Sequence, residues 1–502
     1  MTSRTLRQSQ VSATIDHIGE DLLQNIVGRL PATSFASAAC VNRSWNLVCD
    51  RVLSRPKLAS ACSFNPSLQD AVEEVVNKVL SDPIRPHFAI ASVAGYYYED
   101  ALGDARQLIN AALGTHVPVI INRPHGIIGR DAISDEFKEI EWYNPTDEID
   151  AIMLIVGFLP GLKAKIIPLL KQVQEQRAVM IDEFVTDIRD FSTSVSGCNS
   201  PAAVIMMSDS CYESIKDAIE KLDYAMSPET VVVGNPSSQF RCTNDAQFGT
   251  SAAVALVFAV DMNKPPGIGE TQFHAVLSSG LSPVGPTYKA TSVNGNNYTT
   301  RITARREGSG EHIDGETILN QAYDEIGDPD QYHALLIGVT KKREYSIGQE
   351  NVGCMTSLAF HGVPWSSQGD FYVPGGALKT GDAFRLYHTG STTALSSAAA
   401  VSSHLRSFNQ GSNNTTDGDK IEVFGGLIFT SPDIFSLGQP DINSTPFLDN
   451  FPGVTLGGNF CSSVIGRRVL TPYVKESHEQ MVRCCVHFDC SVFLIMCYTP
   501  LA

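Results

Sequence analysis

The stretch DLLQNIVGRLPATSFASAACVNRSWN, residues 21–46, decides the architecture of the N-terminal part of the chain. Two sets of its apolar residues recur at helical spacing: Leu22, Leu23, Ile26, Val27 and Leu30, and then Val41, Trp45 and, just beyond it, Val48. Pro31 ends the first of these helices, because proline cannot continue a helix from its interior. Ser34, or Thr33 beside it, could cap a further short helix between these two sets. The pattern therefore predicts three short helices in this part of the chain.

Three helices of this length share too little apolar surface to hold a stable core of their own. Two interpretations follow. The helices form a small cap whose apolar faces pack on the rest of this chain, or those faces remain exposed and bind another protein.

The composition favours a globular protein of several domains. The chain has 502 residues, of which 43% are hydrophobic and 18% charged, so about three domains are expected. Its formal net charge of -17 disfavours general binding to nucleic acids, because an acidic protein repels phosphate backbones.

Neither secretion nor a membrane span is expected. The N-terminus MTSRTLRQSQVSATID contains no apolar segment of the kind that a secretory signal requires. The most apolar run, AIMLIVGFLPGLKAKIIPLL, is interrupted by Pro160, Gly161, Lys163 and Lys165 and favours a buried strand, a turn and a helix. The twelve cysteines are scattered, which is typical of reduced thiols in a cytoplasmic or nuclear protein.

Residues 1–13 are predicted to be a disordered tail and residues 14–58 the helical unit. A helix that Ser67 caps follows.

Residues 86–270 alternate between buried strands and amphipathic helices. Six apolar runs are predicted to be strands, namely 88–94, 117–121, 152–158, 178–184, 203–207 and 230–234. Helices over 99–114, which Gly114 ends, and 211–226 alternate with them. This alternation favours an α/β domain with many parallel strand neighbours.

Residues 271–498 have a different texture. Gly, Ser, Asn and Pro become frequent, strand-like runs dominate, and one clear helix remains at GETILNQAYDEIG, residues 315–327. The polar run NQGSNNTTDGD, residues 409–419, is predicted to be a loop. The chain as a whole is therefore expected to have a mixed α+β fold, with layered sheets and helices and more antiparallel sheet in its C-terminal half.

No set of catalytic residues emerges from the motifs. PPGIGETQFH contains Gly267 and Gly269 but lacks the third glycine and the following acid of a dinucleotide site. Neither a G-x-S-x-G nor an H-E-x-x-H motif occurs. RCCVHFDC, residues 483–490, favours a strand with packed thiols over a zinc site. We expect no catalytic residue, no metal and no cofactor.

ARREG, residues 304–308, places Arg305, Arg306 and Glu307 together. These side chains could clamp an anion. The more common alternative is a strand end with solvated charges.

The opening stretch resembles the F-box, whose pattern is roughly L-P-x-x-L-L-x-x-I-L-x-x-L-P followed by an apolar residue and V-x-x-x-W. The departure is Gly19, where the family has a proline that opens the first helix. The resemblance implies that an adaptor of the Skp type binds through Ile18, Leu22, Leu23, Ile26, Leu30, Pro31, Phe35, Val41 and Trp45.

The remainder resembles a FIST domain (F-box and intracellular signal transduction) of the plant F-box/FIST type. FAIASVAG resembles the start of its N-terminal half, taken as 86–270, and LSSGLSPVGPTYKATSV, TARREG, SLAFHGV and NFPGVTLGGNFCSSVIG resemble its C-terminal half, taken as 271–498. The family often carries G-x-F-x-x-G-E-I-G near the end. Gly458, Phe460, Ile465 and Gly466 match this motif, while Ser463 and Val464 replace its Gly-Glu pair.

The resemblance implies a non-catalytic, substrate-recognition subunit of an SCF-type ubiquitin ligase. The F-box would bind the Skp-type adaptor, and through it the cullin and RING subunits, while the FIST region would bind an unknown target protein. The alternative is an intracellular sensor of a small, amino-acid-like ligand. The candidate ligand or target site is Arg305, Arg306, Glu307, Gly458, Phe460 and Cys461.

Overall fold

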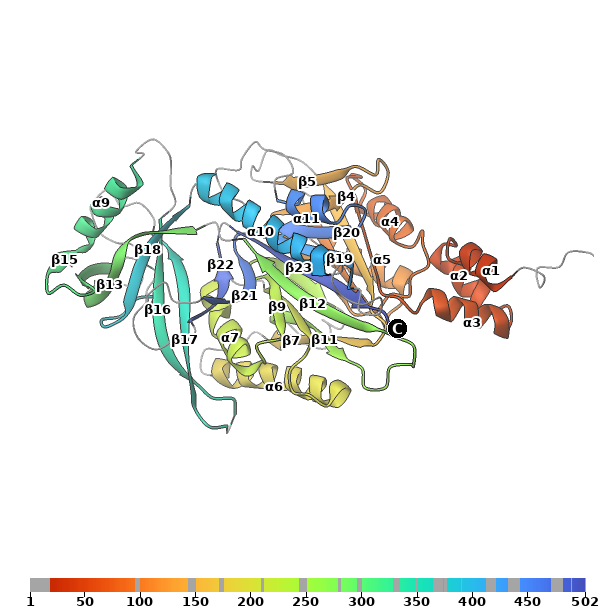
Figure 1. Cartoon of the computed structure of the whole chain (residues 1–502), viewed down its shortest axis with the longest axis horizontal. Coiled ribbons are helices and arrows are strands. Elements are labelled where there is room, and N and C mark those ends of the chain that lie inside the picture. Colours follow the sequence, from red (N-terminus) through yellow and green to blue (C-terminus); the bar gives the residue numbers. More distant parts are fainter. Residues whose placement is uncertain are drawn as a thin grey trace, which may run out of the picture.

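The molecule is elongated, with a helical unit at one end and a larger body built on three sheets (Figure 1). The computed structural model describes residues 19–94, 100–142, 150–170, 176–208, 212–242, 251–278, 281–295, 300–327, 335–348, 350–363, 373, 377–389, 391–411, 421–431, 443–470, 482–488 and 490–501. The predicted tail at 1–13 and most of the predicted loop at 409–419 lie outside these residues.

The N-terminal end forms the three predicted helices, α1 (Glu20–Val27), α2 (Ala32–Ala39) and α3 (Arg43–Val52). Pro31 immediately precedes α2, where its fixed φ suits the entry to a helix. Asn42 caps α3, because its side-chain oxygen accepts a hydrogen bond of 2.9 Å from the Trp45 backbone N–H. These helices lie within the predicted range 14–58, and from here on we call residues 20–52 the helical unit.

A five-stranded sheet follows, in the order β1-β6-β2-β3-β10. Its strands are β1 (Lys57–Ser63), β6 (Ala151–Phe158), β2 (Phe88–Ala94), β3 (Val119–Arg123) and β10 (Gln239–Cys242). Helices α4 (Leu68–Val79) and α5 (Ala101–Leu113) cover one face and pack on the alternate residues of its strands. The other face packs into the central core of the body, so the strands are buried on both sides.

A six-stranded sheet has the order β12-β23-β19-β20-β4-β5. Its strands are β12 (Glu270–Leu277), β23 (Ser491–Thr499), β19 (Glu422–Thr430), β20 (Thr455–Phe460), β4 (Gly126–Arg130) and β5 (Phe137–Glu141). Helices α10 (Ser391–Gly411) and α11 (Thr445–Asn450) cover its outer face, and its inner face contributes to the central core.

A twelve-stranded sheet runs along the rest of the body in the order β15-β14-β13-β18-β16-β17-β22-β21-β9-β8-β11-β7. Its strands are β15 (His312–Asp314), β14 (Thr300–Arg306), β13 (Leu281–Gly295), β18 (Ala383–Thr389), β16 (Leu335–Tyr345), β17 (Gly353–Gly362), β22 (Val482–His487), β21 (Val464–Leu470), β9 (Val231–Asn235), β8 (Ala203–Ser208), β11 (Ser251–Val260) and β7 (Leu162–Leu170). Helices α6 (Arg177–Ser196) and α7 (Tyr212–Ala225) cover its inner part, and α9 (Gly315–Ile326) covers its outer end.

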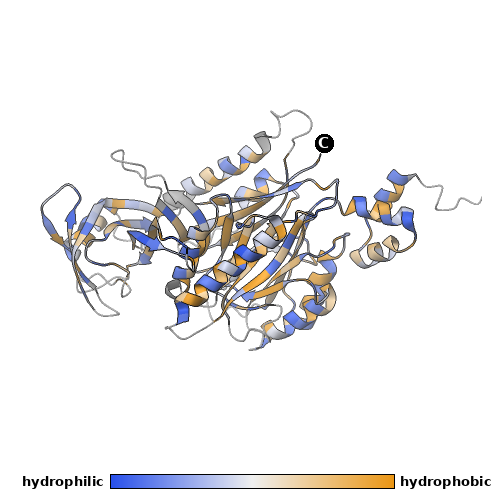
Figure 2. Ribbon diagram, turned by 90° about the horizontal axis from the view of Figure 1, so that it is seen from below, coloured by the Kyte–Doolittle hydropathy of each residue, from blue (hydrophilic) through white to orange (hydrophobic). Residues whose placement is uncertain are grey.

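Hydrophobic residues follow the strands of the body and one side of its covering helices (Figure 2). The central core contains residues from all three sheets, among them Phe88, Phe258 and Leu494. Among the helices that the structure describes, none has both the length and the apolar composition needed to span a bilayer.

The structure confirms the mixed α+β class and corrects four expectations. Where one clear helix was expected after residue 271, α10 and α11 are present in addition to α9. Residues 178–184 lie within α6, and the apolar run after Pro160 forms strand β7 where a helix was expected. Between residues 86 and 270 the described strands form only two parallel pairs, β2–β3 and β8–β9. Hairpins and long-range antiparallel pairs supply the remaining neighbours there.

The ranges 86–270 and 271–498 share two of the three sheets. The six-stranded sheet combines β4 and β5 with four strands of the later range, and the twelve-stranded sheet joins β9 to β21. Strands from the two ranges therefore pair directly with each other, and the ranges are not separate units joined only by loops.

Candidate functional site

The helical unit has a very small core. Its buried apolar residues are Leu23, Val27, Phe35, Ala38, Val48 and Cys49. Each of the three helices contributes two of them, at spacings of three, four or one residues along its length. The half-buried side chains of Leu30 and Trp45 pack against this cluster.

Other apolar residues of the unit face outward. Leu22 is 57% exposed, Ile26 43%, Val41 59% and Leu47 57%. Leu22 and Ile26 are four residues apart and share one face of α1. Four of the eleven large apolar residues that are exposed in the described part of the chain thus lie between residues 22 and 47. Such a concentration on a small unit is typical of a surface that another protein covers.

Polar side chains border this surface. An open hollow between α1, α3 and the following segment is lined by Asp21, Gln24, Asn25, Gly28, Arg29, Arg51, Val52, Ser54 and Arg55. Arg51 forms an ion pair of 2.7 Å with Glu20, and both side chains are mostly exposed. An apolar centre with a charged rim is the usual composition of a protein–protein interface.

The structure divides the predicted adaptor contacts into two groups. Leu22, Ile26, Val41 and the exposed Pro31 lie at the surface, whereas Leu23 and Phe35 are buried in the unit. For Leu23 and Phe35 the structure therefore supports a packing role in place of a direct contact. Ile18 lies outside the described residues.

Leu47 was not among the predicted contacts. The core stripe of α3 comprises Trp45, Val48, Cys49 and Val52, and Leu47 lies off that stripe. An apolar residue outside the stripe that buries the helix is the sequence signal that could have identified it.

Few contacts join the unit to the body. The Ala32 N–H donates a hydrogen bond of 2.9 Å to the Leu80 carbonyl, and Ala32 and Leu53 pack against the core beneath α4. Arg55 forms an exposed ion pair of 3.1 Å with Glu422. The unit therefore projects from one end of the body with most of its surface accessible (Figure 1).

These features define a docking module, and comparison with known proteins identifies which one. Residues 15–57 match the family model of the F-box domain. Over 509 residues the chain is 38% identical to the F-box/LRR-repeat protein At5g63520 of Arabidopsis thaliana, an alignment that covers 96% of this chain and 93% of that protein. The chain belongs to the F-box protein family.

The name of that relative includes leucine-rich repeats. In the described residues of this chain, the strands form three mixed sheets with extensive antiparallel pairing. No stack of equal repeats is present in that part of the molecule.

A second candidate site is a buried polar network where parallel strands end. Asn459 on β20 donates to Ser92 on β2 (3.4 Å), and Ser92 donates to Asn122 on β3 (2.8 Å). Asn122 donates to Ser238, just after β9 (3.5 Å). These residues are at most 2% exposed, so the network lies inside the body.

The network reflects a feature that occurs three times in the fold. The parallel pairs β2–β3, β8–β9 and β19–β20 are each connected through a helix. The second strand of each pair carries a buried asparagine at or near its carboxyl end, namely Asn122, Asn235 and Asn459. The carboxyl ends of parallel strands are where ligands bind in open α/β sheets.

Three predicted site residues adjoin this network. Gly458 and Phe460 lie on β20, and the Cys461 thiol donates to the Asn459 side-chain oxygen at 3.3 Å. Burial raises the pKa of the Cys461 thiol, which keeps it protonated. A Cβ on Gly458 would lie 1.9 Å from the Ile428 carbonyl oxygen, so this glycine permits close strand packing.

Arg305, Arg306 and Glu307 lie far from these residues. They are exposed at the end of β14, near the outer edge of the twelve-stranded sheet, whereas β20 lies in the middle of the molecule (Figure 1). The structure does not bring the two halves of the predicted ligand site together. Arg305 and Arg306 also face opposite sides of the sheet, because successive strand residues alternate.

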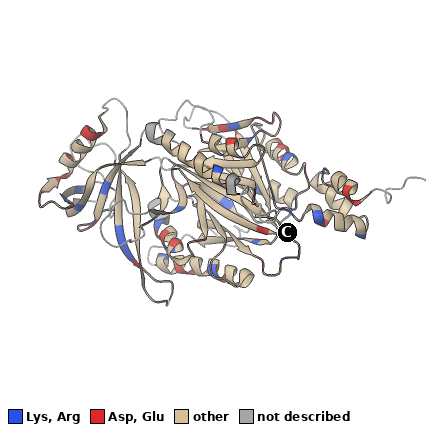
Figure 3. Cartoon of the chain, viewed as in Figure 1, with Lys and Arg blue, Asp and Glu red and all other residues tan. Residues whose placement is uncertain are grey.

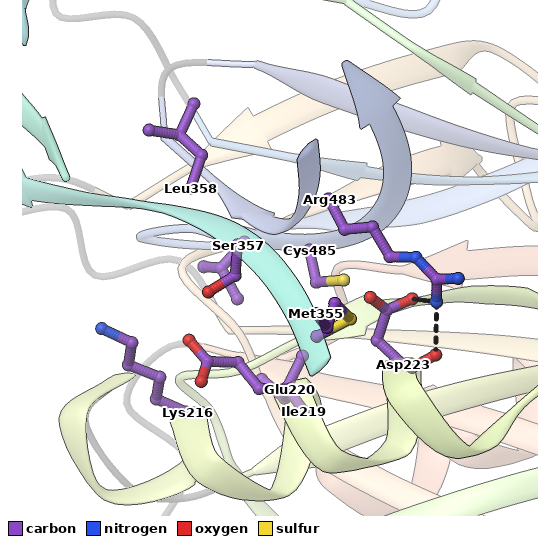
Figure 4. A pocket seen from close by; sticks show the side chains of 10 residues that line it. Lys216, Ile219, Glu220, Asp223, Met355, Ser357, Leu358, Arg483 and Cys485 are labelled. Atoms are coloured by element: carbon purple, nitrogen blue, oxygen red, sulfur yellow. Dashed lines mark hydrogen bonds and ion pairs between the residues drawn. The ribbon is translucent and has the colours of Figure 1, made fainter. Parts of the chain in front are cut away.

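A small cavity lies between α7, β17 and β22, as Figure 4 shows. Its volume of about 10 Å³ suits roughly one water molecule. Asp223 on α7 forms ion pairs with Arg467 and Arg483, and burial raises the pKa of the adjacent Cys485 thiol. These ion pairs attach α7 to the sheet. The cavity beside them is too small for a metabolite.

The cysteine and histidine side chains near residue 487 pack within the sheet. The Cys484 sulfur is 3.8 Å from His487 Nδ1, and His487 Nε2 is 2.8 Å from the Gly466 carbonyl oxygen. Among the residues that the structure describes, no three His, Cys, Asp or Glu side chains gather as metal ligands.

Proposed function

We propose that this chain is the substrate-recognition subunit of an SCF-type ubiquitin ligase. The observation that carries the proposal is the exposure of four large apolar side chains on the helical unit, from here on called the F-box unit, namely Leu22, Ile26, Val41 and Leu47. This surface binds the Skp-type adaptor, and the adaptor connects the chain to the cullin and RING subunits.

The body is, in this proposal, a FIST-type region that holds the target protein. The segments that resemble FIST domains lie on β2, β13, β14, β17 and β20, and these strands belong to all three sheets. The body would hold the target, while the helical unit, which projects from one end of the body, would bind the adaptor (Figure 1).

The chain itself performs no covalent step in this mechanism. It raises the effective concentration of the target near a charged conjugating enzyme, and the transfer of ubiquitin occurs on the other subunits. Such a complex would act in the cytoplasm or the nucleus.

The test compares adaptor binding by variants with equal changes of charge. Leu22→Asp combined with Ile26→Asp should weaken binding to the purified adaptor by about 2 kcal/mol or more, roughly thirtyfold, because two apolar anchors are lost. Trp45→Ala should act in the same direction. Isothermal titration calorimetry provides the affinities.

The matched control is Val179→Asp combined with Val352→Asp. Both valines are exposed in the body, at 59% and 63%, so the control adds the same charge without touching the unit. Equal adaptor affinity for the wild type, the unit variant and the control would reject the proposal.

The buried polar network favours a second candidate function, the sensing of a small polar ligand. Asn235 is fully buried, and among the residues that the structure describes its side-chain N–H₂ has no hydrogen-bond partner, which is costly unless another group satisfies it. A ligand with carbonyl or carboxylate oxygens would supply that acceptor. Its binding would raise the melting temperature of the full chain.

A thermal-shift screen with the free amino acids tests this alternative. A hit should disappear in Asn235→Ala and persist in the Leu22→Asp/Ile26→Asp variant, because the two sites are separate. A screen without stabilising compounds would count against a sensor of this class.

A further inference from the structure

The outer end of the twelve-stranded sheet is basic, although the chain as a whole is acidic. The segment from Leu281 to Arg306 contains four Lys or Arg residues and no Asp or Glu, in a chain of net charge -17. Strands β13, β14 and β15 lie at the end of the molecule opposite the F-box unit (Figure 1), and basic residues mark this end in Figure 3.

The strand register brings these charges onto one face. Lys289 on β13 lies directly opposite Arg305 on β14, and Arg305 lies opposite His312 on β15. Arg301 precedes Arg305 by four residues on the same strand, so it shares that face at a distance of about 13 Å. All four side chains are exposed, and we call them the basic face.

This arrangement reduces the stability of the hairpin when no anion lies between the charges. Like charges that lie directly opposite on neighbouring strands are destabilising. Within the described part of the chain, neither Lys289 nor Arg305 has an ion-pair partner. The hairpin thus keeps two adjacent positive charges that form no ion pair with a described carboxylate, although the exposed Asp314 lies on the same face, opposite Thr303.

We propose that the basic face binds an acidic segment of the target protein. An extended peptide that runs along β14 could place one carboxylate between Lys289 and Arg305 and a second one near Arg301. Guanidinium groups bind carboxylates through paired hydrogen bonds, which supplies orientation as well as attraction.

A short acidic peptide fits this surface better than a nucleic acid does. Glu307, Glu311 and Glu316 are exposed just beyond the basic face, and the rest of the chain is negative. A long polyanion would meet these carboxylates, whereas a peptide with a few acidic residues would not.

This inference rests on the proposed function, since it assigns the target surface of the same ligase subunit. The position of the basic face suits the binding of a target. The adaptor would occupy one end of the molecule, and the basic face at the other end would remain accessible to a target (Figure 1).

The experiment measures fluorescence anisotropy with full-length protein and defined probes. The probes are a short peptide of alternating Glu and Gly, the same peptide with Gln, its phosphoserine counterpart, and single-stranded DNA of equal charge. The Glu peptide should bind more tightly than the Gln peptide and the DNA, and its binding should weaken as salt is added.

Lys289→Glu combined with Arg305→Glu should reduce affinity for the Glu peptide by about tenfold. Arg85→Glu combined with Arg241→Glu is the matched control, because both arginines are exposed elsewhere in the body. The control should retain the affinity of the wild type.

The single variant Arg305→Glu separates binding from folding. It places a carboxylate opposite Lys289, so it should raise the melting temperature while it weakens peptide binding. A plain solvated strand end would show no loss of peptide binding in this variant.

Three results would overturn the inference: equal affinity for the Glu and Gln peptides, tighter binding of the DNA, or binding of the phosphoserine peptide alone. Adaptor affinity, measured on the same variants, should stay at the wild-type value. If the wild type failed to bind adaptor but still bound the Glu peptide, the ligase proposal would fail and the acidic-peptide site would stand.

Discussion

The F-box unit and the body differ in how completely they bury their apolar side chains. In the unit, six buried residues form the core, while Leu22, Ile26, Val41 and Leu47 remain exposed. In the body, strands such as β6 and β8 are buried along their whole length, with helices on one face and a second sheet on the other. The body buries its apolar residues by itself, whereas the F-box unit leaves apolar residues exposed for the proposed partner.

This difference assigns separate tasks to the two regions. The exposed apolar surface of the F-box unit is in contact with water until a partner binds, so it is small and has a polar rim. In the proposed function the body holds a target and must therefore be rigid, and close packing on both faces of its sheets provides that rigidity. Substitutions in the body should therefore change the stability of the body without changing adaptor binding, and substitutions in the unit should leave the stability of the body unchanged.

The largest expected effect is in the central core of the body. Phe258 is fully buried, and its ring centroid lies 5.0 Å from that of Phe88 and 5.4 Å from that of Phe273. Phe258→Ala should lower the free energy of unfolding by about 3–5 kcal/mol, because it leaves a cavity between the sheets. Chemical denaturation measures the change.

Phe191→Ala on α6 is the control, since Phe191 is only half-buried and should cost less. The folded fraction of both variants should bind adaptor as the wild type does. A loss of adaptor affinity in folded Phe258→Ala protein would show that the two regions are coupled.

Two neighbouring residues of α1 sharpen the comparison within the unit. Leu23→Ala should cost about 2–5 kcal/mol, because Leu23 is 5% exposed in a core of few residues. Leu22→Ala should cost less than about 0.5 kcal/mol, because Leu22 is at the surface.

Amide hydrogen exchange resolves where the stability is lost. Leu23→Ala should increase exchange in residues 20–52 and leave the strands of the body protected, because few contacts join the two regions. Uniform loss of protection across the chain would contradict this separation.

Local signals made much of the secondary structure predictable. Helical spacing around Pro31, the Ser67 cap of α4 and the glycines that end α5 and α9 all act within a few residues, and the structure has these elements. The helical unit was therefore predictable almost entirely from its own sequence.

The pairing of strands was not predictable in this way. AVMIDEF, residues 178–184, has an apolar composition that fits a buried strand as well as a helix, and its position on α6 depends on packing against β7 and β11. The pairing of β4 with β20 joins residues more than 300 positions apart, and no local pattern specifies it.

The candidate site was predictable only in part. The F-box pattern gave the apolar residues of the unit but did not separate the exposed Leu22 from the buried Leu23, because one turn of helix carries both. The pairing of Lys289 with Arg305 depends on the register of a hairpin with a bulge, which the sequence does not specify.

A half-buried carboxylate, that of Glu141 on β5, gives the body a pH dependence. Burial raises the pKa of Glu141 on β5 to about 7, from an ordinary value of 4.5. Between these two values the folded state holds a proton that the unfolded state has released, so stability should fall as pH rises through this window and stay lower above it.

Glu141→Gln removes the titrating group and should flatten this dependence. The variant should gain stability over the wild type as pH rises from 5 to about 7, when thermal unfolding is measured across that range. Asp82→Asn, at an exposed carboxylate, is the control for replacing a carboxylate by an amide. A parallel slope in wild type and Glu141→Gln would contradict the assignment.

The smallest expected effects come from two helix caps, one in each region. Asn42→Ala removes the acceptor for the Trp45 N–H in α3, and Ser67→Ala removes the acceptor for the Asp70 N–H at 3.3 Å in α4. Each should cost about 1 kcal/mol, because one backbone donor at the start of a helix loses its partner. The two substitutions are chemically similar, so the difference between their effects reports on their surroundings.

In the unit the lost energy is a large share of the stability of a few packed side chains. Asn42→Ala should therefore raise amide exchange through α3 and weaken adaptor binding slightly. In the body the same loss is spread over a much larger cooperative structure, and Ser67→Ala should shift the global melting temperature by a small amount without local opening. If both caps changed only the global transition, the F-box unit would unfold together with the body, and the two regions would form one cooperative structure.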